Sequence, residues 1–569
     1  MSAAIVIRNL QPTIADGTFP VKRETDRPLE VSVEVFSRKD VDCRLLYRSL
    51  GEEKWSSLPL APGPGAAWKG ILPLTECGSY QFTVEAGTPE GTAARADLVQ
   101  ELWIGTERSR FGAWYELFPR SQGTDPGKHG TFRDVERRLP DIKAMGFDVI
   151  YVPPICPIGR TNRKGKNNSL EAAPEDPGTP WSVGTEAGGH ADFHPELGTE
   201  KDFLHLMGEM KKLGLELALD FTSNCSPDHP WIKEHPEWFF YNPDGTIKYA
   251  ENPPKKYEDV CPLNFETEDR QALWQEIRAI FLTWVERGVT TFRIDNPHTK
   301  PTEFWAWLIR EIRKKSPEAV FLAEAFTDYD KLEELALAGF TQSYCYFTWR
   351  TGKNELIEYF SKLTNTYLAE FLRVNLFTNT PDILSEYLQT GGKPAFLIRY
   401  CLAATLGSLC GIYSGFELLE NEPLVPGKEA YLDSEKYEVK VRDWDKPGNI
   451  KPYISQLNRI RRDNQALHYY DNLRFFSSTD DSILCYGKIS PDRENIIVCA
   501  VNLDPFQPHT GRITLPLERF GIGSNEAYRV IDLLKKTEET WKGREQVITL
   551  DPAEMPVRIY RIETAPVVV

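Results

Sequence analysis

Two short stretches of the chain each end a brief apolar run on a single ionisable carboxylate. Gly-Val-Thr-Thr-Phe-Arg-Ile-Asp-Asn-Pro-His at 288–298 delivers Asp295, and Phe-Leu-Ala-Glu-Ala-Phe at 321–326 delivers Glu324. Side chains at the C-terminal ends of parallel barrel strands converge on one mouth of the barrel. Two carboxylates there, with Arg293 two residues before the first, are the equipment of a retaining glycosidase or glycosyltransferase. The alternative is that both carboxylates are structural, satisfied by caps or salt bridges.

The residue types predict different catalytic roles for three acids. Asp295, on a short stem, suits a covalent nucleophile, and Arg293 on the same face of the strand can hold it ionised and oriented. Glu324 has apolar neighbours, so we expect a raised pKa that suits a general acid. Asp382 is expected to favour an oxocarbenium-like transition state, although the N-cap of a helix starting near Ile383 is an equal alternative for it.

The region from 105 to 474 alternates strands with amphipathic helices, the pattern of a parallel sheet. Eight strands predict a (β/α)₈ TIM barrel with inserted loops. The expected strands are 113–118, 148–152, 216–221, 290–295, 320–324, 343–347, 372–377 and 411–414, and the helices include 200–213 and 302–315. Two long loops rich in Gly, Pro and Asn, 153–198 and 222–265, follow strand ends and are expected to be functional.

The two ends of the chain have a different pattern. Residues 1–104 and 475–569 carry short alternating apolar and polar runs broken by turns. This spacing predicts an N-terminal and a C-terminal β-sandwich flanking the catalytic barrel. A chain of 569 residues is also too long for a single core, so three domains are consistent with its length.

Composition narrows the class of partner. The formal net charge of −16, without a basic block, argues against a nucleic-acid partner and an anionic membrane surface. There is no signal peptide at the N-terminus and no apolar run of membrane-spanning length, so a cytoplasmic protein is expected. The ten cysteines are scattered without a C-x-x-C pair, which favours buried reduced thiols over disulfides or a metal site.

The carboxylates and their neighbours resemble glycoside hydrolase family 13, the α-amylase family. That resemblance implies a barrel with an insertion after its third strand, a C-terminal β domain and three catalytic acids. The four short family regions fall, in order, at 219–224, 292–295, Glu324 and Asp382. The chain departs from ordinary α-amylases at Cys225 and Pro381, where that family often has His.

A more specific resemblance is carried by five longer motifs between 111 and 470. They are Phe-Gly-Ala-Trp-Tyr-Glu-Leu-Phe-Pro-Arg-Ser, Ile-Gly-Arg-Thr-Asn-Arg-Lys-Gly-Lys-Asn-Asn, Glu-Asn-Pro-Pro-Lys-Lys-Tyr-Glu-Asp, Asp-Asn-Pro-His-Thr-Lys-Pro and Asp-Ser-Glu-Lys-Tyr-Glu. They are similar to the bacterial α-1,4-glucan:maltose-1-phosphate maltosyltransferases. The resemblance implies that Asp295 is the nucleophile, Glu324 the acid/base and Asp382 the transition-state stabiliser. The substrate-binding set, to which we add Asn168, Trp181 and Arg293, is Lys164, Asn224, Asp259, Asn296, Lys436 and Tyr437.

A sugar phosphate needs cationic and neutral donors around its phosphate, with no general demand for a metal or cofactor. Asn252, Lys255 and Tyr257 lie in one irregular Pro-Pro segment and supply an amide, an ammonium and a phenol. The resemblance assigns these three side chains to the phosphate. The alternative is that Lys255 and Lys256 are only solvated loop charges.

Two departures from the subgroup affect narrower expectations. The resemblance implies a homodimer, but a helical segment that forms part of the family's dimer contact is missing, because 102–110 runs almost directly into Phe111. Asn224 stands where the subgroup is expected to have Gln. The sequence assigns no role to His190 and His194.

The chain is therefore predicted to move a maltosyl unit from α-maltose 1-phosphate to the non-reducing 4-hydroxyl of an α-1,4-glucan, with retention and release of phosphate. This would extend a glycogen-like glucan. The alternative within enzymes is an α-glucan hydrolase or a 4-α-glucanotransferase of the α-amylase family. The alternative outside enzymes is a non-catalytic glucan-binding barrel, although such proteins commonly lack one of the three acids, all present here.

Overall fold

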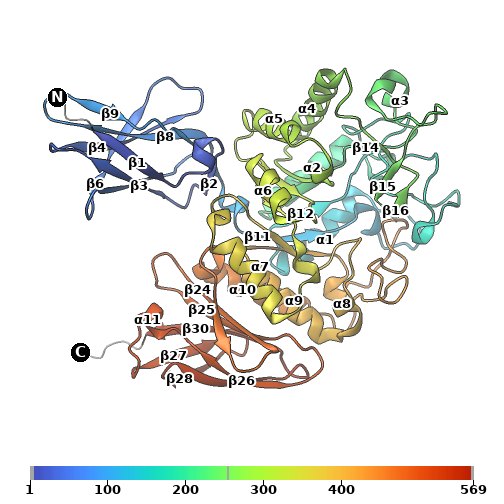
Figure 1. Cartoon of the computed structure of the whole chain (residues 1–569). Coiled ribbons are helices and arrows are strands. Elements are labelled where there is room, and N and C mark those ends of the chain that lie inside the picture. The colour runs from blue at the N-terminus through green and yellow to red at the C-terminus, as the bar shows by residue number, and fades with distance from the viewer. Residues whose placement is uncertain (1–4, 253–254, 565–569) are drawn as a thin grey trace.

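A computed structural model describes residues 5–252 and 255–564 of the chain. An N-terminal pair of β-sheets, a central barrel and a C-terminal β-rich part follow one another along the chain (Figure 1). The barrel lies between the two β-rich parts in sequence and contacts both of them. The predicted fold class, a (β/α)₈ barrel flanked by β-sandwiches, is confirmed.

The barrel is an eight-stranded parallel sheet. Its spatial order is β20-β19-β18-β13-β12-β11-β22-β21, so chain neighbours pair throughout. The strands are β11 (Gly112–Glu116), β12 (Val149–Val152), β13 (Glu216–Phe221), β18 (Thr291–Ile294), β19 (Val320–Ala323), β20 (Gln342–Ser343), β21 (Asn375–Phe377) and β22 (Leu409–Tyr413). A parallel bridge between Ser343 and Val374 joins the two ends of this order, and the backbone N–H of Ser343 donates to the carbonyl of Arg373 at 2.9 Å. These contacts close the ring.

All eight predicted barrel strands are present, but three were predicted too long: β11 ends at Glu116 instead of 118, β21 begins at Asn375 instead of 372, and β20 is the shortest. The strand expected over 343–347 ends at Ser343, and Tyr346–Trp349 form a 3-10 helix instead. In this aromatic run, Phe347 packs against Arg399. The Cζ atom of the Arg399 guanidinium lies 3.8 Å from the centroid of the Phe347 ring. Local β propensity was overridden by this tertiary packing.

The helices of the barrel domain alternate with its strands. They are α1 (Phe132–Ala144), α2 (Glu200–Lys212), α4 (Arg270–Glu286), α5 (Thr302–Arg313), α6 (Tyr329–Leu337), α7 (Lys353–Thr364), α8 (Glu386–Thr390), α9 (Gly392–Leu406) and α10 (Lys451–Asp463). Capping boxes at Thr131 and Thr199 fix where α1 and α2 begin, because each side chain accepts from the N3 backbone N–H.

The two long loops contain local structure. The loop over 153–198 includes two short 3-10 helices, Lys166–Asn168 and Pro195–Leu197. The loop over 222–265 includes the helix α3 (Trp231–Glu234) and two small antiparallel pairs. These pairs join β14 (Asn224–Cys225) to β17 (Cys261–Pro262) and β15 (Ala250–Asn252) to β16 (Lys255–Tyr257). Both loops follow the C-terminal ends of barrel strands.

The N-terminal part consists of two sheets. One has the order β1-β3-β7-β6, and the other has the order β2-β10-β8-β4-β5 with β9 on β8. Their strands are β1 (Val6–Gln11), β2 (Val21–Glu24), β3 (Leu29–Phe36), β4 (Asp42–Ser49), β5 (Ser56–Pro59), β6 (Ala61–Pro62), β7 (Ala67–Leu72), β8 (Gly78–Gly87), β9 (Ala93–Arg95) and β10 (Gln100–Gly105). Alternate residues of β3 are buried, as a half-buried strand requires.

The C-terminal part has its own apolar core. Its strands have the order β28-β27-β30-β25-β24-β23-β26-β29. They are β23 (Arg474–Ser478), β24 (Ile483–Ile489), β25 (Ile496–Asn502), β26 (His509–Thr514), β27 (Ala527–Asp532), β28 (Thr537–Lys542), β29 (Glu545–Leu550) and β30 (Val557–Thr564), with the short helix α11 (Leu517–Phe520) between β26 and β27. Ile483, Val498 and Ile562 are among the residues of this core.

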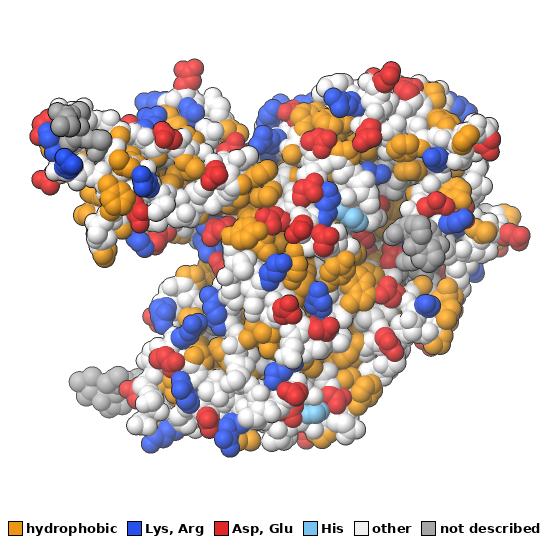
Figure 2. Space-filling model, viewed as in Figure 1, with side chains coloured by type: hydrophobic (Ala, Val, Ile, Leu, Met, Phe, Trp, Pro, Cys, Tyr) orange, Lys and Arg blue, Asp and Glu red, His pale blue; other side chains and the backbone are white. Residues whose placement is uncertain are grey.

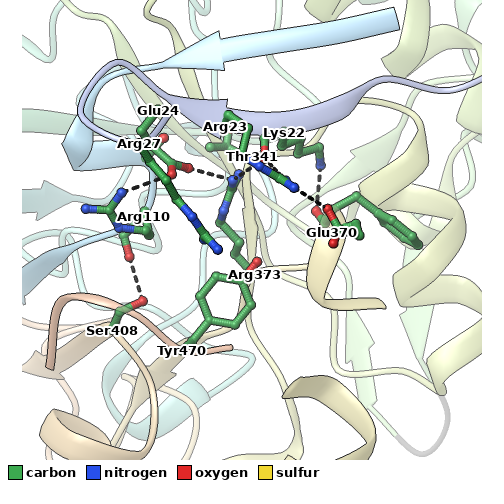
Figure 3. A network of polar contacts seen from close by, with 12 residues as sticks. Lys22, Arg23, Glu24, Arg27, Arg110, Thr341, Glu370, Arg373, Ser408 and Tyr470 are labelled. Carbon is green, nitrogen blue, oxygen red and sulfur yellow. Dashed lines mark hydrogen bonds and ion pairs between the residues drawn. The ribbon is translucent and has the colours of Figure 1, made fainter. Parts of the chain in front are cut away.

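A buried ionic network fastens the N-terminal sheets to the barrel (Figure 3). Glu24, at the end of β2, is fully buried and contacts Arg110 at 3.0 Å and Arg373 at 2.5 Å. The ammonium of Lys22 donates to three backbone carbonyls at the C-terminal end of α6 and beyond it, those of Ala336, Phe340 and Phe371. Buried charges that are paired and hydrogen-bonded in this way hold two parts of a chain in one register.

The surface charges and the state of the cysteines agree with what the sequence composition predicts. On the face drawn in Figure 2, Lys and Arg side chains are interspersed with Asp and Glu. All ten cysteines are free, and nine of them are buried. Among the residues that the structure describes, no helix combines the length and apolarity needed to cross a membrane.

Candidate active site

Two neighbouring barrel strands deliver the first two acids to the same edge of the sheet. Asp295 directly follows β18 and Glu324 directly follows β19, and Ile294 is paired with Ala323 across these strands. The backbone N–H of Glu324 donates to the carbonyl of Ile294 at 3.0 Å. The two carboxylates therefore occupy equivalent positions on adjacent strands, at the C-terminal mouth of the barrel.

One guanidinium gathers three carboxylates beneath this mouth. The Nη1 atom of Arg293 lies 2.9 Å from Oδ2 of Asp220 and 3.0 Å from Oδ1 of Asp295. Its Nη2 atom lies 3.1 Å from Oε1 of Glu324. Arg293 is itself buried, with 6% of its side chain exposed. The sequence predicted the contact with Asp295 alone, so the link to the other two acids is a finding of the structure.

Further hydrogen bonds orient the two acids. The hydroxyl of Thr222 donates to Oδ2 of Asp295 at 3.0 Å. Asn296 adopts a left-handed conformation, with φ of 44°, and its backbone N–H donates to Oε2 of Glu324 at 3.2 Å. Asn and Asp tolerate this conformation better than other non-glycine residues. The chain turn after Asp295 thus positions Glu324 on the neighbouring strand.

The environment of Glu324 favours its protonated form. Burial raises the pKa of Glu324 to about 8, and repulsion from Asp295 and Asp382 adds to the rise, against the attraction of Arg293. The raised pKa expected for Glu324 agrees with this. A carboxyl group that keeps its proton at neutral pH is able to donate it to a leaving group.

Asp220 forms a second layer under the mouth. Burial raises its pKa to about 7, opposed by the adjacent Arg293. Its Oδ2 atom accepts from the hydroxyl of Tyr151 at 2.7 Å and from the indole N–H of Trp181 at 3.1 Å. Asp220 therefore links Arg293 to Trp181, one of the predicted substrate-binding residues.

Asp382, the third acid, is held by a lysine. The Nζ atom of Lys436 lies 2.6 Å from Oδ1 of Asp382 and 5.1 Å from the ring centroid of Trp181. Burial disfavours the charge of Lys436, but attraction to Asp382 outweighs it and raises the pKa of the lysine. The N-cap alternative for Asp382 is wrong, because the next helix begins at Glu386 and its N-cap is Ser385.

A cavity of about 560 Å³ opens over these acids. It brings together all three predicted catalytic acids and most of the predicted substrate-binding residues, which are far apart in the sequence. Those lining it are Lys164, Asn168, Trp181, Asn224, Tyr257, Asp259, Arg293, Asp295, Asn296, Glu324, Asp382, Lys436 and Tyr437.

The loop residues of this set are held by local contacts. Lys164 is almost fully buried and forms an ion pair with Glu258. Burial raises the pKa of the neighbouring Asp259 to about 6, and its Oδ2 atom is a buried acceptor with no donor among the described residues. A buried acceptor of this kind at a cavity wall is available to a ligand hydroxyl. Burial also raises the pKa of Tyr257, so its phenol remains a hydrogen-bond donor.

Two predicted phosphate ligands are only partly described. Asn252 ends β15 and Lys255 begins β16, and their backbones pair across this short hairpin. Their side chains lie outside the described part of the chain, and their role stays a prediction. The expectation that this segment is not helical agrees with the two strands.

His190, to which the sequence gave no role, is hydrogen-bonded to the backbone of Asn224. Its Nε2 atom faces the carbonyl of Asn224 at 3.1 Å, and burial lowers its pKa to about 4, so the ring is neutral and donates there. Ligand atoms of His190, Cys225 and His229 lie within 4.8 Å of one another. However, Nδ1 of His229 accepts from the backbone N–H of Trp231, which leaves the ring proton on Nε2. Metal ligation through that nitrogen is therefore disfavoured.

His194 does not line the cavity. Its Nδ1 atom accepts from the backbone N–H of Glu196 at 3.3 Å, at the start of the 3-10 helix Pro195–Leu197, and its ring stacks on His129 with centroids 5.1 Å apart. These contacts give His194 a structural role in the first long loop.

Several residues of the cavity wall were missed by the sequence reasoning. They are Thr179, Ser223, Tyr249, Ala250, Glu251, Val260, Pro262, His298, Thr299, Lys300, Phe326, Trp349, Ile383 and Glu429. A signal existed for His298 and Lys300, which lie in the motif Asp-Asn-Pro-His-Thr-Lys beside Asp295, and for Phe326, two residues after Glu324. Trp349 carried no signal, because it lies beyond the strand predicted over 343–347, in the 3-10 helix Tyr346–Trp349.

Sequence models of three protein families match the chain. Residues 3–98 match "Alpha-1,4-glucan:maltose-1-phosphate maltosyltransferase, domain N/S", residues 116–305 match "Alpha amylase, catalytic domain" and residues 475–562 match "GLGE, C-terminal". Among solved structures, a maltogenic α-amylase from Thermotoga neapolitana has a TM-score of 0.61 at 18% identity, covering 81% of this chain and 100% of that one. An α-amylase from Lactobacillus plantarum has a TM-score of 0.59 at 21% identity, covering 80% and 100%. These likenesses show the fold.

Curated relatives are more similar in sequence. An alpha-1,4-glucan:maltose-1-phosphate maltosyltransferase from Rhodospirillum rubrum is 42% identical, covering 99% of this chain and 95% of the relative. The protein of that name from Pseudomonas aeruginosa is 41% identical over 98% and 96%, and the one from Myxococcus xanthus is 50% identical over 83% and 70%. The Rhodospirillum alignment spans 657 positions against 569 residues here, so that relative carries segments this chain lacks. The chain belongs to the alpha-1,4-glucan:maltose-1-phosphate maltosyltransferase family, within the α-amylase superfamily.

Proposed function

We propose that the chain transfers a maltosyl unit from α-maltose 1-phosphate to the non-reducing 4-hydroxyl of an α-1,4-glucan, and releases phosphate. The observation that carries the proposal is the pair of strand-end acids on one guanidinium, Asp295 at 3.0 Å and Glu324 at 3.1 Å from Arg293. Asp295 is the nucleophile, Glu324 the acid/base and Asp382 the stabiliser of the transition state. Family membership supports this donor and this acceptor.

In the first step, a carboxylate oxygen of Asp295 bonds to the anomeric carbon while the bond from that carbon to the phosphate oxygen breaks. The electron pair stays on the phosphate oxygen, which takes the proton of Glu324. Burial keeps this proton in place near neutral pH, because it raises the pKa of Glu324 to about 8. The products are a maltosyl ester of Asp295, hydrogen phosphate and an ionised Glu324.

In the second step, the ionised Glu324 takes the proton of the acceptor 4-hydroxyl. The acceptor oxygen then bonds to the anomeric carbon, and Asp295 leaves as a carboxylate. Two inversions at that carbon give net retention. Transfer competes with hydrolysis, so the acceptor must be positioned and water excluded at this stage.

The cavity wall supplies the contacts for the donor. Lys164, Asn168, Trp181, Asn224, Asp259, Asn296, Lys436 and Tyr437 hold its two glucose rings, and Tyr257 together with Asn252 and Lys255 holds its phosphate. Lysines and hydrogen-bonding side chains suit this donor, because a sugar phosphate presents hydroxyls and a dianion. No cofactor is required by either chemical step.

We place the enzyme in the cytoplasm, acting on a glycogen-like acceptor. A homodimer is the state implied by the family resemblance, yet β10 and β11 are joined by residues 106–111 alone, so the helical segment expected at that dimer contact is missing.

Product analysis separates this proposal from the alternative within enzymes. The protein is incubated with maltohexaose in the presence and absence of maltose 1-phosphate, and product lengths are measured by mass spectrometry. The proposal predicts products longer by two glucose units each, formed only when the phosphate donor is present. Redistribution of chain lengths from maltohexaose alone would instead identify a 4-α-glucanotransferase, and shortening alone a hydrolase.

A further inference from the structure

Among the side chains that the structure describes, four cationic ones line the cavity, and three of them already contact carboxylates of the protein. The pairs are Lys164 with Glu258, Arg293 with Asp295 and Glu324, and Lys436 with Asp382. The fourth is Lys300, which forms no ion pair with any residue that the structure describes; its Nζ atom lies 5.8 Å from the ring centroid of Phe265. Among the described cations of the cavity, Lys300 is thus the one that lacks a carboxylate partner.

The surroundings of Lys300 make this charge unfavourable in the empty cavity. Burial lowers its pKa to about 8, and attraction to Asp295 only partly opposes the effect. A desolvated ammonium without a partner carboxylate opposes folding, because burying a charge is unfavourable unless it is paired. Such a group in a cavity wall indicates a binding site for an anion more than a structural contact.

The chain holds Lys300 close to the reacting carboxylates. It lies five residues after Asp295 and directly follows the 3-10 helix Pro297–Thr299. The carbonyl of Pro297 accepts from the indole N–H of Trp305 in α5 at 3.1 Å, which anchors this turn to the barrel. The position of Lys300 is therefore set by ordered backbone rather than by a long surface loop.

The other described charges of the wall favour an additional cation for an anionic donor. Six carboxyl groups of the described residues line the cavity, against four described cations: Glu251, Asp259, Asp295, Glu324, Asp382 and Glu429. A phosphate dianion entering this wall is repelled by those acids that are ionised, and three of the cations are already engaged. We infer that Lys300 binds the phosphate of the sugar-phosphate donor beside Asp295 and selects that donor over a neutral glucan.

The inference rests on the proposed function and gives Lys300 one part in its first step. As the bond between the anomeric carbon and the phosphate oxygen breaks, the electron pair remains on the phosphate and the proton comes from Glu324. Lys300 keeps its own proton throughout and stabilises the departing anion through a charge-assisted hydrogen bond. A neutral leaving group gains nothing from this contact, so Lys300 acts on donor choice.

Two substitutions and a matched control test the assignment. Lys300→Met removes the charge and keeps the length, Lys300→Arg keeps the charge, and Lys256→Met removes an exposed lysine of the rim, with 58% of its side chain exposed. Three quantities are measured: KM for maltose 1-phosphate, the inhibition constant of inorganic phosphate, and kcat/KM for α-maltosyl fluoride, which has no phosphate. Thermal unfolding confirms that each variant is folded.

For Lys300→Met, we expect KM for maltose 1-phosphate and the inhibition constant of phosphate to rise at least about tenfold, with α-maltosyl fluoride used as before. Lys300→Arg should recover most of the loss, and Lys256→Met should match the wild type. Equal losses on both donors, or no loss on either, would overturn the assignment. Failure of the wild type to release phosphate would instead overturn the proposed function, and would leave phosphate inhibition as a separate readout of Lys300.

Discussion

The Nη2 atom of Arg293 lies 3.1 Å from Oε1 of Glu324, yet the pKa of Glu324 is raised to about 8. A neighbouring cation alone would lower this pKa. Burial and the nearby carboxylates outweigh it, because Arg293 divides its charge among three acids. The guanidinium therefore holds Glu324 in place without ionising it, which is the state that an acid catalyst needs.

The first prediction concerns the pH dependence of donor cleavage. Because Glu324 must be protonated to protonate the phosphate, and because Lys300 must stay charged to bind it, kcat/KM for maltose 1-phosphate should fall as pH rises through about 8. Departure of fluoride needs no proton, so kcat/KM for α-maltosyl fluoride should stay level from pH 7 to 9. Initial rates for both donors over this range make the comparison. The same alkaline fall for both donors would assign the ionisation to another group.

The second prediction concerns stability. The folded-state pKa of Glu324 is above its usual value of 4.5, so the folded state retains a proton that the unfolded state releases between pH 4.5 and 8. Its contribution is full below pH 4.5 and is lost as pH rises towards 8. Glu324→Gln removes this dependence, so its Tm should exceed that of the wild type at pH 8, by about 1 °C for each kcal/mol because the entropy of unfolding grows with chain length, and approach it near pH 5.

The matched control for this experiment is Glu554→Gln, because Glu554 is exposed. Its Tm difference from the wild type should not change between pH 5 and 8. A Tm difference for Glu324→Gln that is constant over the same range would mean that Glu324 is ionised in the folded protein.

The third prediction identifies the nucleophile. A 2-deoxy-2-fluoro-α-maltosyl fluoride should label the protein with one 2-deoxy-2-fluoromaltosyl group. The fluorine at C2 slows both steps, and the good fluoride leaving group restores only the first, so the covalent intermediate accumulates. Peptide mapping should place the label on Asp295, whose Oδ atoms are held by Arg293 and Thr222. Asp295→Ala should take up no label and lose at least about 10⁴-fold in turnover. Labelling of another carboxylate would reject this role for Asp295.

The fourth prediction concerns the network that joins the N-terminal sheets to the barrel. Glu24→Gln leaves the buried Arg110 and Arg373 without their shared carboxylate, which should lower the free energy of unfolding by about 3 kcal/mol. Activity below the transition should be unchanged, since Glu24 does not line the cavity. Denaturant unfolding monitored by Trp fluorescence measures the difference.

A control for this network is Glu30→Gln, whose partner Lys69 lies 3.0 Å away with both side chains more than half exposed. An exposed pair contributes about 1 kcal/mol at most. If Glu24→Gln has an effect as small as Glu30→Gln, the buried network does not hold the two parts together.

Much of the barrel and of its acids was predictable because the relevant signals are local. Each barrel strand is a short apolar run between helices, and a residue directly after such a run must lie at the mouth, as Asp295 and Glu324 do. The strand 343–347 was overpredicted, because the packing of Phe347 on Arg399 is a long-range contact that no local pattern records.

The ion pairs inside the site were harder to predict from the sequence. The sequence pairs Arg293 with Asp295 by spacing, but the contacts of Arg293 with Asp220 and Glu324 depend on which strands are neighbours. The ion pair of Lys436 with Asp382 was also not predictable, because these residues are 54 positions apart along the chain. Lys300 stood in a motif near Asp295, but that no described carboxylate pairs with it is visible only when the cavity wall is assembled.

The central claim is that the leaving group is phosphate. The most direct measurement is the release of inorganic phosphate from maltose 1-phosphate in the presence of maltohexaose, followed together with the length of the glucan. The account predicts one phosphate for each two-glucose extension in the wild type, and neither product from Asp295→Ala. Extension without phosphate release, or no reaction of the wild type with maltose 1-phosphate, would contradict it.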